Sequence, residues 1–512
     1  MSGTVAEILI NGRQLTIEQV VEIADHPEIQ VSVNPAAIPA INRAADAVQQ
    51  LISEGRIAYG ITTGFGAFKD KLISADEVEK LQENIILSHA IGVGPLLDDR
   101  TVRAIMLIRA NTLVKGHSGI RLETVNLLLA LLNRNILPLI PSKGSLGASG
   151  DLAPLAHMSL ALLGVGQVKM DGQVIEARDA LRKASLQPIK LAAKEGLALT
   201  NGTTMMTAIG ALLVHAAESL LDTANCVGAM SIEAQNGTLK AFSPKLHAAR
   251  PQKFQAETAA QIRDLLSGSQ LTRPDNSTNV QDAYTLRCIP QVHGAVRSAI
   301  EYARSVVETE LNSVTDNPLL FFEDGHLEVV SGGNFHGEPL ALALDFMAIA
   351  LADLGNMSER RIAKLIDNHT EHYPSFLAAQ GGLNSGFMLL QYTAAALASE
   401  NKSLAHPSSL DTLPSSGNVE DHVSMGANAA NHCTMVLENV TTILAIELMS
   451  AAQAIDFRLK EDPARQLGKG TAVAMRKVRE ITPFFAKDTF FQPYLLKLVD
   501  LVRSGGFSTD MA

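Results

Sequence analysis

The stretch TTMMTAIGALLVHAAESLLDTANCVGAMSIEAQN, residues 203–236, contains no proline and is followed directly by Gly237. Because glycine commonly follows the C-terminus of a helix, the stretch predicts one helix of about 50 Å at a rise of 1.5 Å per residue. Similar helix-forming runs cover residues 292–314, 340–366, 386–403 and 428–457. The sequence therefore predicts a mainly α fold, a bundle of long helices around one core.

Small β elements are expected only in the N-terminal part. Residues 7–10 and 57–61 are β-like, and Asp171-Gly172 is a turn signal for a hairpin within residues 168–175. A helix-like run over residues 36–54 separates the first two β-like pieces. The sequence has no fixed-period repeat and no low-complexity linker, so we expect indistinct domain boundaries.

The composition is apolar and poor in charge. Of 512 residues, 46% are hydrophobic, 19% charged and 4% aromatic, with no tryptophan. Lysine and arginine number 42 against 53 acidic residues, a net charge of −11 that argues against a nucleic-acid partner. The three cysteines, Cys226, Cys288 and Cys433, are widely spaced, which predicts reduced thiols in a cytoplasmic protein.

Two long uncharged stretches, residues 196–217 and 381–399, are long enough to span a membrane. Polar side chains are spread through both, and such side chains are costly in lipid, so we expect helices buried within protein and no membrane partner. Residues 1–13 do not have the pattern of a signal peptide. A chain with so little charge to cover its surface is expected to associate with copies of itself.

Two glycine-rich loops carry the candidate chemistry: YGITTGFG at residues 59–66 and GSLGASGD at residues 144–151. The second is expected to be held by helices on both sides. Its serine, Ser149, lies between Ala148 and Gly150. Small neighbours allow the Gly150 nitrogen to attack the Ala148 carbonyl carbon, and loss of two waters, one involving the Ser149 hydroxyl, gives a methylidene-imidazolone electrophile. An ordinary glycine-rich turn is the alternative.

A serine hydrolase is a second alternative for this loop. Its nucleophile elbow has the pattern G-x-S-x-G after a strand. Here Gly147 lies two residues before Ser149, but Gly150 follows at once and Asp151 occupies the place of the final glycine. The pattern therefore argues against the hydrolase.

The loop GSLGASGDLAPL resembles the electrophile loop of the aromatic amino acid ammonia-lyases and aminomutases. Further matching strings follow in family order: LSHAIGVG (87–94), EGLALTNGT (195–203), VQDAYTLRCIPQVHG (280–294), TDNPL (315–319), SGGNFHGEP (331–339) and EDHVSMG (420–426). Departures are mild: Thr200 precedes Asn201 where an aliphatic residue is usual, and Val419 stands where glutamine is common. The resemblance implies the ammonia-lyase/fumarase-like long-helix bundle, and a self-made cofactor with no nucleotide or metal.

The resemblance also implies a homotetramer in which three subunits build each active site. It suggests an N-terminal region, 1–200, with the active-site loops and the electrophile-forming loop, and a helical region, 201–512. A non-catalytic helical assembly protein is the alternative from another class, but it predicts loss of Tyr59, Ser149 or Arg287, and all three are present.

Residue roles come from the resemblance joined to chemical need. Arg287 matches the arginine that binds the substrate carboxylate, for which a forked guanidinium is suited. Asn201 and Gln281 match positions that contact the electrophile or the substrate's carboxylate and amine. Phe335 matches a residue that walls the electrophile; a core phenylalanine is the alternative.

Two tyrosines match catalytic positions. Tyr59 matches the base that removes the β-proton, and Tyr284 matches a second tyrosine lining the site. A phenol is a poor base at neutral pH unless positive charge or hydrogen bonding stabilises its anion. A structural role for Tyr59 is the alternative.

His89 and Glu420 determine the expected substrate. Ser88-His89 falls at the family's selectivity position, where hydrogen-bonding residues suit imidazole or phenol. Glu420-Asp421-His422 replaces the Asn-Gln-Asp usual in phenylalanine and tyrosine enzymes, so it favours L-histidine, eliminated to trans-urocanate and ammonia. A tyrosine or phenylalanine lyase, or a 2,3-aminomutase, is the alternative.

No metal or nucleotide is expected. His369 and His372 flank Glu371 without forming an HExxH pattern, and Pro374 follows closely. The pairs Gly92/Gly94 and Gly164/Gly166 lack the third glycine of a dinucleotide-binding motif.

Overall fold

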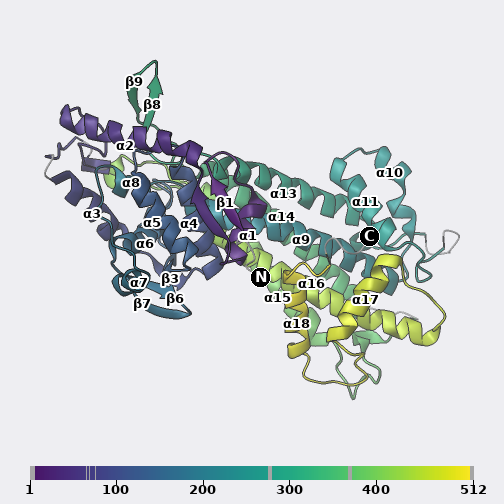
Figure 1. Cartoon of the computed structure of the whole chain (residues 1–512). Coiled ribbons are helices and arrows are strands. Elements are labelled where there is room, and N and C mark those ends of the chain that lie inside the picture. Colours follow the sequence, from purple (N-terminus) through teal and green to yellow (C-terminus); the bar gives the residue numbers. More distant parts are fainter. Residues whose placement is uncertain are drawn as a thin grey trace. The chain divides into compact units, whose positions relative to one another are not determined.

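The computed structural model of the chain describes residues 6–64, 66–68, 70–74, 77–274, 280–366 and 372–507. Helices predominate in this part, and the strands form small sheets of two or three strands (Figure 1). The predicted mainly α fold with minor β elements is confirmed. His369 and Glu371 of the rejected metal motif lie outside the described residues.

The chain divides into two compact units. The first combines Met1–His215, Ala303–Asp345 and Pro407–Asn431, and the second combines Ala216–Tyr302, Phe346–His406 and His432–Ala512. Four of the five dividing points fall inside long helices, α9 (Thr204–Ala234), α13 (Ile289–Leu311), α14 (Glu338–Ile366) and α16 (Gly426–Glu461). The fifth lies between His406 and Pro407, in the loop after α15 (Met388–Leu404). The proposed regions 1–200 and 201–512 stay a prediction, since the units interleave along the chain.

The first unit holds the β elements and eight helices of its own among the described residues. The helices are α1 (Ile17–Asp25), α2 (Ile38–Ser53), α3 (Val78–His89), α4 (Asp99–Leu113), α5 (Leu122–Asn133), α6 (Leu152–Leu160), α7 (Ala177–Lys183) and α8 (Glu195–Thr200). The strands are β1 (Glu7–Ile10), β2 (Gln30–Val33), β3 (Val93–Leu96), β4 (Leu137–Pro138), β5 (Pro141–Lys143), β6 (Gln167–Met170), β7 (Gln173–Glu176), β8 (Leu319–Glu323) and β9 (His326–Val330).

The strands pair locally. Strands β1 and β2 pair in parallel, and α1 lies between them in the sequence. Helix α1 begins with a capping box formed by Thr16 and Gln19. Strand β3 pairs antiparallel with β5, and the predicted hairpin at residues 168–175 is β6–β7, extended by β4. Its turn residues Asp171 and Gly172 both have positive φ, as a tight hairpin turn requires. The remaining hairpin is β8–β9 (Figure 1).

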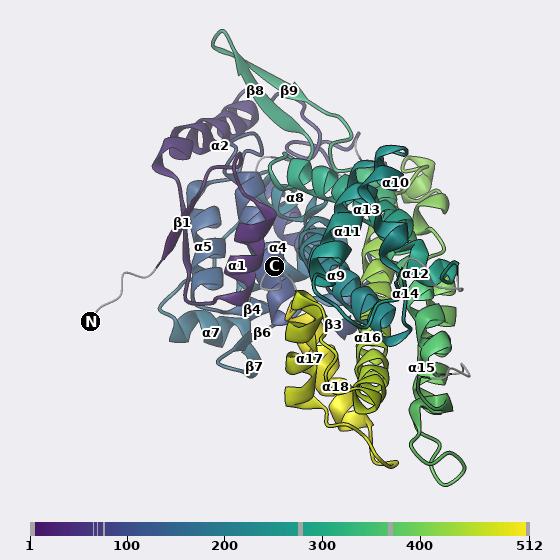
Figure 2. The ribbon, with the colours of Figure 1, turned by 90° about the vertical axis from the view of Figure 1, so that its right-hand side faces the viewer.

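Helices belonging only to the second unit are α10 (Pro244–Ala248), α11 (Lys253–Leu265), α12 (Tyr284–Arg287), α15 (Met388–Leu404), α17 (Lys469–Ile481) and α18 (Gln492–Arg503). The neighbouring helices α17 and α18 pack together, as their yellow ribbons show in Figure 2. In the core of this unit, the buried carboxylate of Glu447 in α16 accepts hydrogen bonds from Ser231 of α9 and from Ser358 and Arg361 of α14. This network ties the long helices to one another.

Two local predictions are wrong. Residues 57–61 form no strand: 57 and 58 are irregular and 59–61 are in turns. The Thr62 hydroxyl accepts a hydrogen bond from the Ala58 amide (2.9 Å) and donates one to the Arg56 carbonyl (2.8 Å), so these backbone groups do not pair with another strand. The loop at residues 144–151 has a helix on one side only, since it runs from β5 into α6.

Three helices are long and apolar enough to cross a membrane by length and composition: α9, α14 and α16. Of their most apolar windows, 78%, 67% and 72% are buried inside the protein. Residues 196–217 are buried as predicted, but 381–399 are not. In that stretch Leu389 and Tyr392 are exposed because α15 buries only one face in the single chain, and Leu383 is exposed in the turn before this helix.

Candidate active site

A cavity of about 1430 Å³ lies in the first unit and collects residues from stretches that are far apart in the sequence. Seven of the predicted site residues line it: Tyr59, His89, Ala148, Ser149, Asn201, Phe335 and Glu420. Gly150 is buried directly behind Ser149 and does not reach the cavity. The folded first unit therefore brings together residues that the sequence motifs could only name separately.

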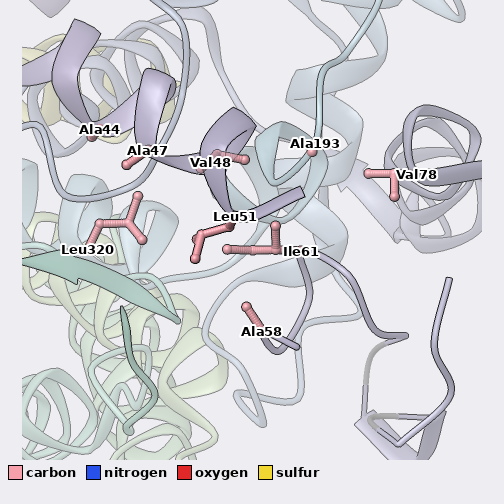
Figure 3. Close-up of a cluster of buried hydrophobic side chains, with 9 residues drawn as sticks. All are labelled: Ala44, Ala47, Val48, Leu51, Ala58, Ile61, Val78, Ala193 and Leu320. Carbon is pink, nitrogen blue, oxygen red and sulfur yellow. The ribbon is translucent and has the colours of Figure 1, made fainter. Parts of the chain in front are cut away.

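The loop that carries Tyr59 is fixed by an apolar cluster on either side of it (Figure 3). Ala58 and Ile61 are buried against the inner face of α2 and against residues of α3 and β8; the whole cluster is Ala44, Ala47, Val48, Leu51, Ala58, Ile61, Val78, Ala193 and Leu320. Tyr59 itself is half-buried and lines the cavity. Its phenolic oxygen accepts a hydrogen bond from the Gly66 amide at 3.2 Å, the kind of contact that stabilises a phenolate.

The loop 148–150 is clamped by a second tight segment, Asn201-Gly202. The Ser149 carbonyl accepts from the Gly202 amide (3.1 Å) and the Asn201 side chain (3.2 Å), and the Asp151 amide donates to the Gly202 carbonyl (2.7 Å). A Cβ on Gly150, whose φ is +75°, would overlap the Gly202 backbone. Only glycine fits at position 150 in this arrangement.

Charged groups buried under this loop have shifted pKa values. Burial raises the pKa of Asp151 to about 7, although hydrogen bonds from the Met206 amide and Ser145 and the charge of Arg109 oppose the shift. Burial lowers the pKa of Arg109 to about 10. Arg109 donates to the carbonyls of Ala198 and Asn201, so it holds the segment that clamps Ser149.

His89 and Glu420 line the cavity from different elements. His89 ends α3, and its Nδ1 lies 3.0 Å from the Ser88 hydroxyl. Desolvation lowers the pKa of His89, while the charge of Glu420 opposes that shift. Glu420 accepts a hydrogen bond from Ser415 at 2.9 Å, which fixes its carboxylate. The cavity thus presents an imidazole and a carboxyl group to a ligand.

Three predicted site residues, Gln281, Tyr284 and Arg287, belong to the second unit and do not line this cavity. The side chain of Arg287 stacks over the Tyr284 ring, with its guanidinium carbon 4.5 Å from the ring centre. Its Nε is buried without a hydrogen-bond partner among the described residues. Tyr284 is 70% exposed on the single chain.

The cavity also has lining residues that were not assigned a role from the sequence. His336, Asp421 and His422 lie within the motifs SGGNFHGEP and EDHVSMG, so their neighbours Phe335 and Glu420 were the signal that could have found them. Lys71 and Ser416-Gly417 carry no such motif and could be placed only by folding.

His336, Glu338 and His422 form a cluster whose side-chain ligand atoms lie within 4.8 Å of one another. The two rings are stacked, with centres 5.5 Å apart. Both nitrogens of His336 already have partners, since Nδ1 faces the Glu338 amide (3.3 Å) and Nε2 faces the His422 carbonyl (3.4 Å). As arranged here, His336 has no nitrogen left for a cation.

The fold and the site define a known class of protein. Residues 15–480 match the model of the aromatic amino acid lyase family, and the chain belongs to this family, whose members are carbon–nitrogen lyases. Histidine ammonia-lyase of Chloroflexus aurantiacus is 56% identical to it, over 99% of this chain and 98% of the relative.

Solved structures extend the comparison. Histidine ammonia-lyase from Trypanosoma cruzi superposes with a TM-score of 0.90 at 39% identity, covering 98% of this chain and 94% of that one. Tyrosine aminomutase from Streptomyces globisporus superposes with a TM-score of 0.92 at 36% identity, covering 99% and 100%. The fold therefore serves more than one substrate, and the substrate has to be argued from the residues of the cavity.

Proposed function

We propose that this chain is a cytoplasmic histidine ammonia-lyase, which removes ammonia from L-histidine without oxidation and releases trans-urocanate, the first step of histidine degradation. The observation that carries the proposal is that His89 and Glu420 both line the cavity that Ser149 lines, close enough for the charge of Glu420 to influence the pKa of His89. The relatives from C. aurantiacus and T. cruzi, both named histidine ammonia-lyase, support the same substrate.

We infer that Ala148, Ser149 and Gly150 form a 4-methylidene-imidazol-5-one. Three features fit this group: a turn that only glycine can make at position 150, a Ser149 carbonyl held by two donors, and a buried Asn201 Oδ1 with no partner among the described residues. The group would supply an electrophile that activates the substrate, chemistry that ordinary side chains do not offer.

The chain's own side chains supply the remaining steps. Tyr59, acting as its phenolate, would accept the β-proton at its phenolic oxygen and become a neutral phenol, and the Gly66 amide would stabilise the anion before the transfer. His89 and Glu420 would hold the imidazole of the substrate by hydrogen bonds, while Phe335 excludes water from one wall of the cavity. Arg287 would pair with the carboxylate, supported by Gln281 and Tyr284.

The alternative function is a tyrosine or phenylalanine lyase, or a 2,3-aminomutase, that uses the same electrophile. The tyrosine aminomutase from S. globisporus supports this alternative, because it has the same fold with a TM-score of 0.92. Purified enzyme should produce urocanate faster than coumarate, cinnamate or any β-amino acid. Faster formation of one of those products would refute histidine as the substrate.

Glu420→Gln is expected to lower kcat/KM for histidine about tenfold or more, because a charge-assisted hydrogen bond to the imidazole is lost. Steady-state rates with histidine and with tyrosine check this, since tyrosine has no imidazole to bind. Glu328→Gln, an exposed carboxylate on β9, is the control and should leave both rates unchanged. A rate with histidine equal to that of the control would contradict the assignment of Glu420.

We further propose a homotetramer with shared active sites. The support is that Gln281, Tyr284 and Arg287 do not line the cavity of their own chain, while apolar residues along α14 and α15 are exposed: Leu342, Phe346, Ile349, Leu389 and Tyr392. Exposed apolar residues of this kind are typical of a surface that a second copy covers.

Shared sites predict complementation between two inactive variants. Ser149→Ala and Arg287→Gln should each be inactive alone, but their co-expression should restore about a quarter of wild-type activity, because sites with both normal residues then form in mixed tetramers. Activity and mass of the purified mixture check this. If the mixture stays as inactive as its parents, each site is built within one chain.

A further inference from the structure

The segment that carries Gln281, Tyr284 and Arg287 has exposed side chains, but buried side chains hold it in place at two points. Val280 is 78% exposed and Tyr284 70%, yet the side chain of Asp282, between them, is only 5% exposed. Burying a carboxylate in this position is costly unless it is paired and hydrogen-bonded. The partners of Asp282 therefore indicate what the burial achieves.

The first fastening point is the ion pair of Asp282 with Arg273. Arg273 donates to Asp282 Oδ1 at 2.7 Å, and both side chains are more than nine-tenths buried. The second oxygen, Oδ2, accepts from the Thr238 amide at 2.7 Å. Arg273 is fixed in turn, because it donates to the Asn236 carbonyl at 2.8 Å and its own amide bonds to the Gly237 carbonyl.

These contacts join the start of the site-bearing segment to the C-terminal end of α9. Asn236, Gly237 and Thr238 follow α9 directly, and Thr238 forms an isolated parallel bridge with Arg273. Both carboxylate oxygens of Asp282 thus accept a hydrogen bond, one from the Arg273 side chain and one from the Thr238 backbone amide. A carboxylate held this way has one orientation.

The second fastening point is the Thr285 carbonyl, three residues after Asp282. Arg361 of α14 donates to it at 3.4 Å. Arg361 and Glu447 are both fully buried and make a bidentate pair at 2.6 and 2.9 Å. Because Ser231 and Ser358 also donate to Glu447, the guanidinium cannot turn without breaking several bonds.

Buried ion pairs are weak evidence for stability, since apolar residues of similar volume often serve stability equally well. Their geometry, however, restricts the backbone that they bind. Here the two anchors hold the backbone at residues 282 and 285. Of the three side chains with expected substrate contacts, Gln281 comes just before the first anchor, Tyr284 lies between the two, and Arg287 follows two residues after the second. The Arg287 guanidinium, stacked over Tyr284 and with its Nε unpartnered, depends on this backbone for its direction.

We propose that Asp282 and Arg361 are positioning residues, which hold Gln281, Tyr284 and Arg287 in the orientation that receives the substrate carboxylate. The proposal rests on the proposed function, because that function assigns these three residues to the substrate. Neither Asp282 nor Arg361 needs to touch the substrate. Their loss should weaken carboxylate binding while leaving the electrophile-forming loop, in the other unit, unchanged.

The test uses full-length enzyme with Asp282→Asn, which keeps the shape and removes the charge. We expect KM for histidine and the inhibition constant of urocanate, which also carries a carboxylate, to rise together about tenfold or more, with a smaller change in kcat. The two-water mass deficit and the oligomeric state should be unchanged, and Asp282→Glu should recover part of the affinity. The control is Asp500→Asn, which breaks an exposed ion pair with Arg503.

A second variant, Arg361→Lys, keeps the positive charge beside Glu447 but lacks the fork that reaches Thr285, and it should raise the same two constants. If either variant folds and has wild-type KM and urocanate inhibition, its residue does not position the segment and the proposal is overturned for it. Failure of the proposed function looks different: wild-type enzyme with the mass deficit would then turn over no histidine at all.

Discussion

The Ser149→Ala variant is expected to lose histidine turnover by about 10³-fold or more, and its chain is expected not to reach the two-water mass deficit. Ser149 supplies the hydroxyl needed for the loss of the second water, and an alanine has no oxygen to lose. Intact-mass measurement of native enzyme should show a deficit of two waters in the wild type and none in the variant. A loss of this size, about 4 kcal/mol or more in barrier, exceeds what removal of one binding contact causes.

The matched control for this variant is Ser142→Ala. Ser142 lies on β5, just before the same loop, but it does not line the cavity. The control should keep both the mass deficit and the activity. An active Ser149→Ala enzyme, or a wild-type chain of full mass, would refute the self-made electrophile, whatever the sequence motif implies.

Tyr59→Phe is expected to lower kcat about 10²- to 10⁴-fold with a small effect on KM, because the variant removes the oxygen that accepts the β-proton but keeps the ring in its place. The mass deficit should persist, since Tyr59 belongs to a different loop from Ser149. Pre-steady-state rates with β-deuterated histidine should show a larger isotope effect in the variant. This separates loss of the base from loss of the electrophile.

Tyr494→Phe is the control for the phenol change. Tyr494 packs edge-on against Phe485 in the second unit and does not line the cavity. Its kcat should match that of the wild type. If Tyr59→Phe also kept the wild-type kcat, another group would be the base, and the hydrogen bond from Gly66 would be structural only.

Much of the helical fold could be predicted from the sequence, because long runs without breakers leave few alternatives. The run 203–236 is α9, Thr204–Ala234, and 428–457 lies within α16, Gly426–Glu461. The run predicted to start at 292 starts earlier, at Ile289, since Pro290 is tolerated in the first turn of a helix. Such boundaries depend on local chemistry and shift by a few residues.

The candidate site was predictable where motif and cavity coincide, and not for the predicted residues that lie outside the cavity, Gln281, Tyr284 and Arg287. Tyr59, His89 and Glu420 could be named from the sequence, and the first unit places all three on one cavity. Residue patterns alone did not show that Arg287 would lie outside this cavity. The exposed face of α15 could not be predicted for the same reason, since hydropathy does not distinguish a core from a surface covered by another copy.

The hydrogen bonds around residues 146–151 also have a consequence for when the proposed cyclisation could take place. The partners of this loop are supplied late in translation: Asn201-Gly202 hold one side of the loop, and on the other side the Met425 amide bonds to the Leu146 carbonyl. More than half of the chain separates Leu146 from Met425. A ribosome adding about 5–20 residues per second therefore takes many seconds to supply the second partner after the loop itself has emerged. If the proposed cyclisation needs this contact, it would follow translation, and a chain that stops short of Met425 would remain unmodified.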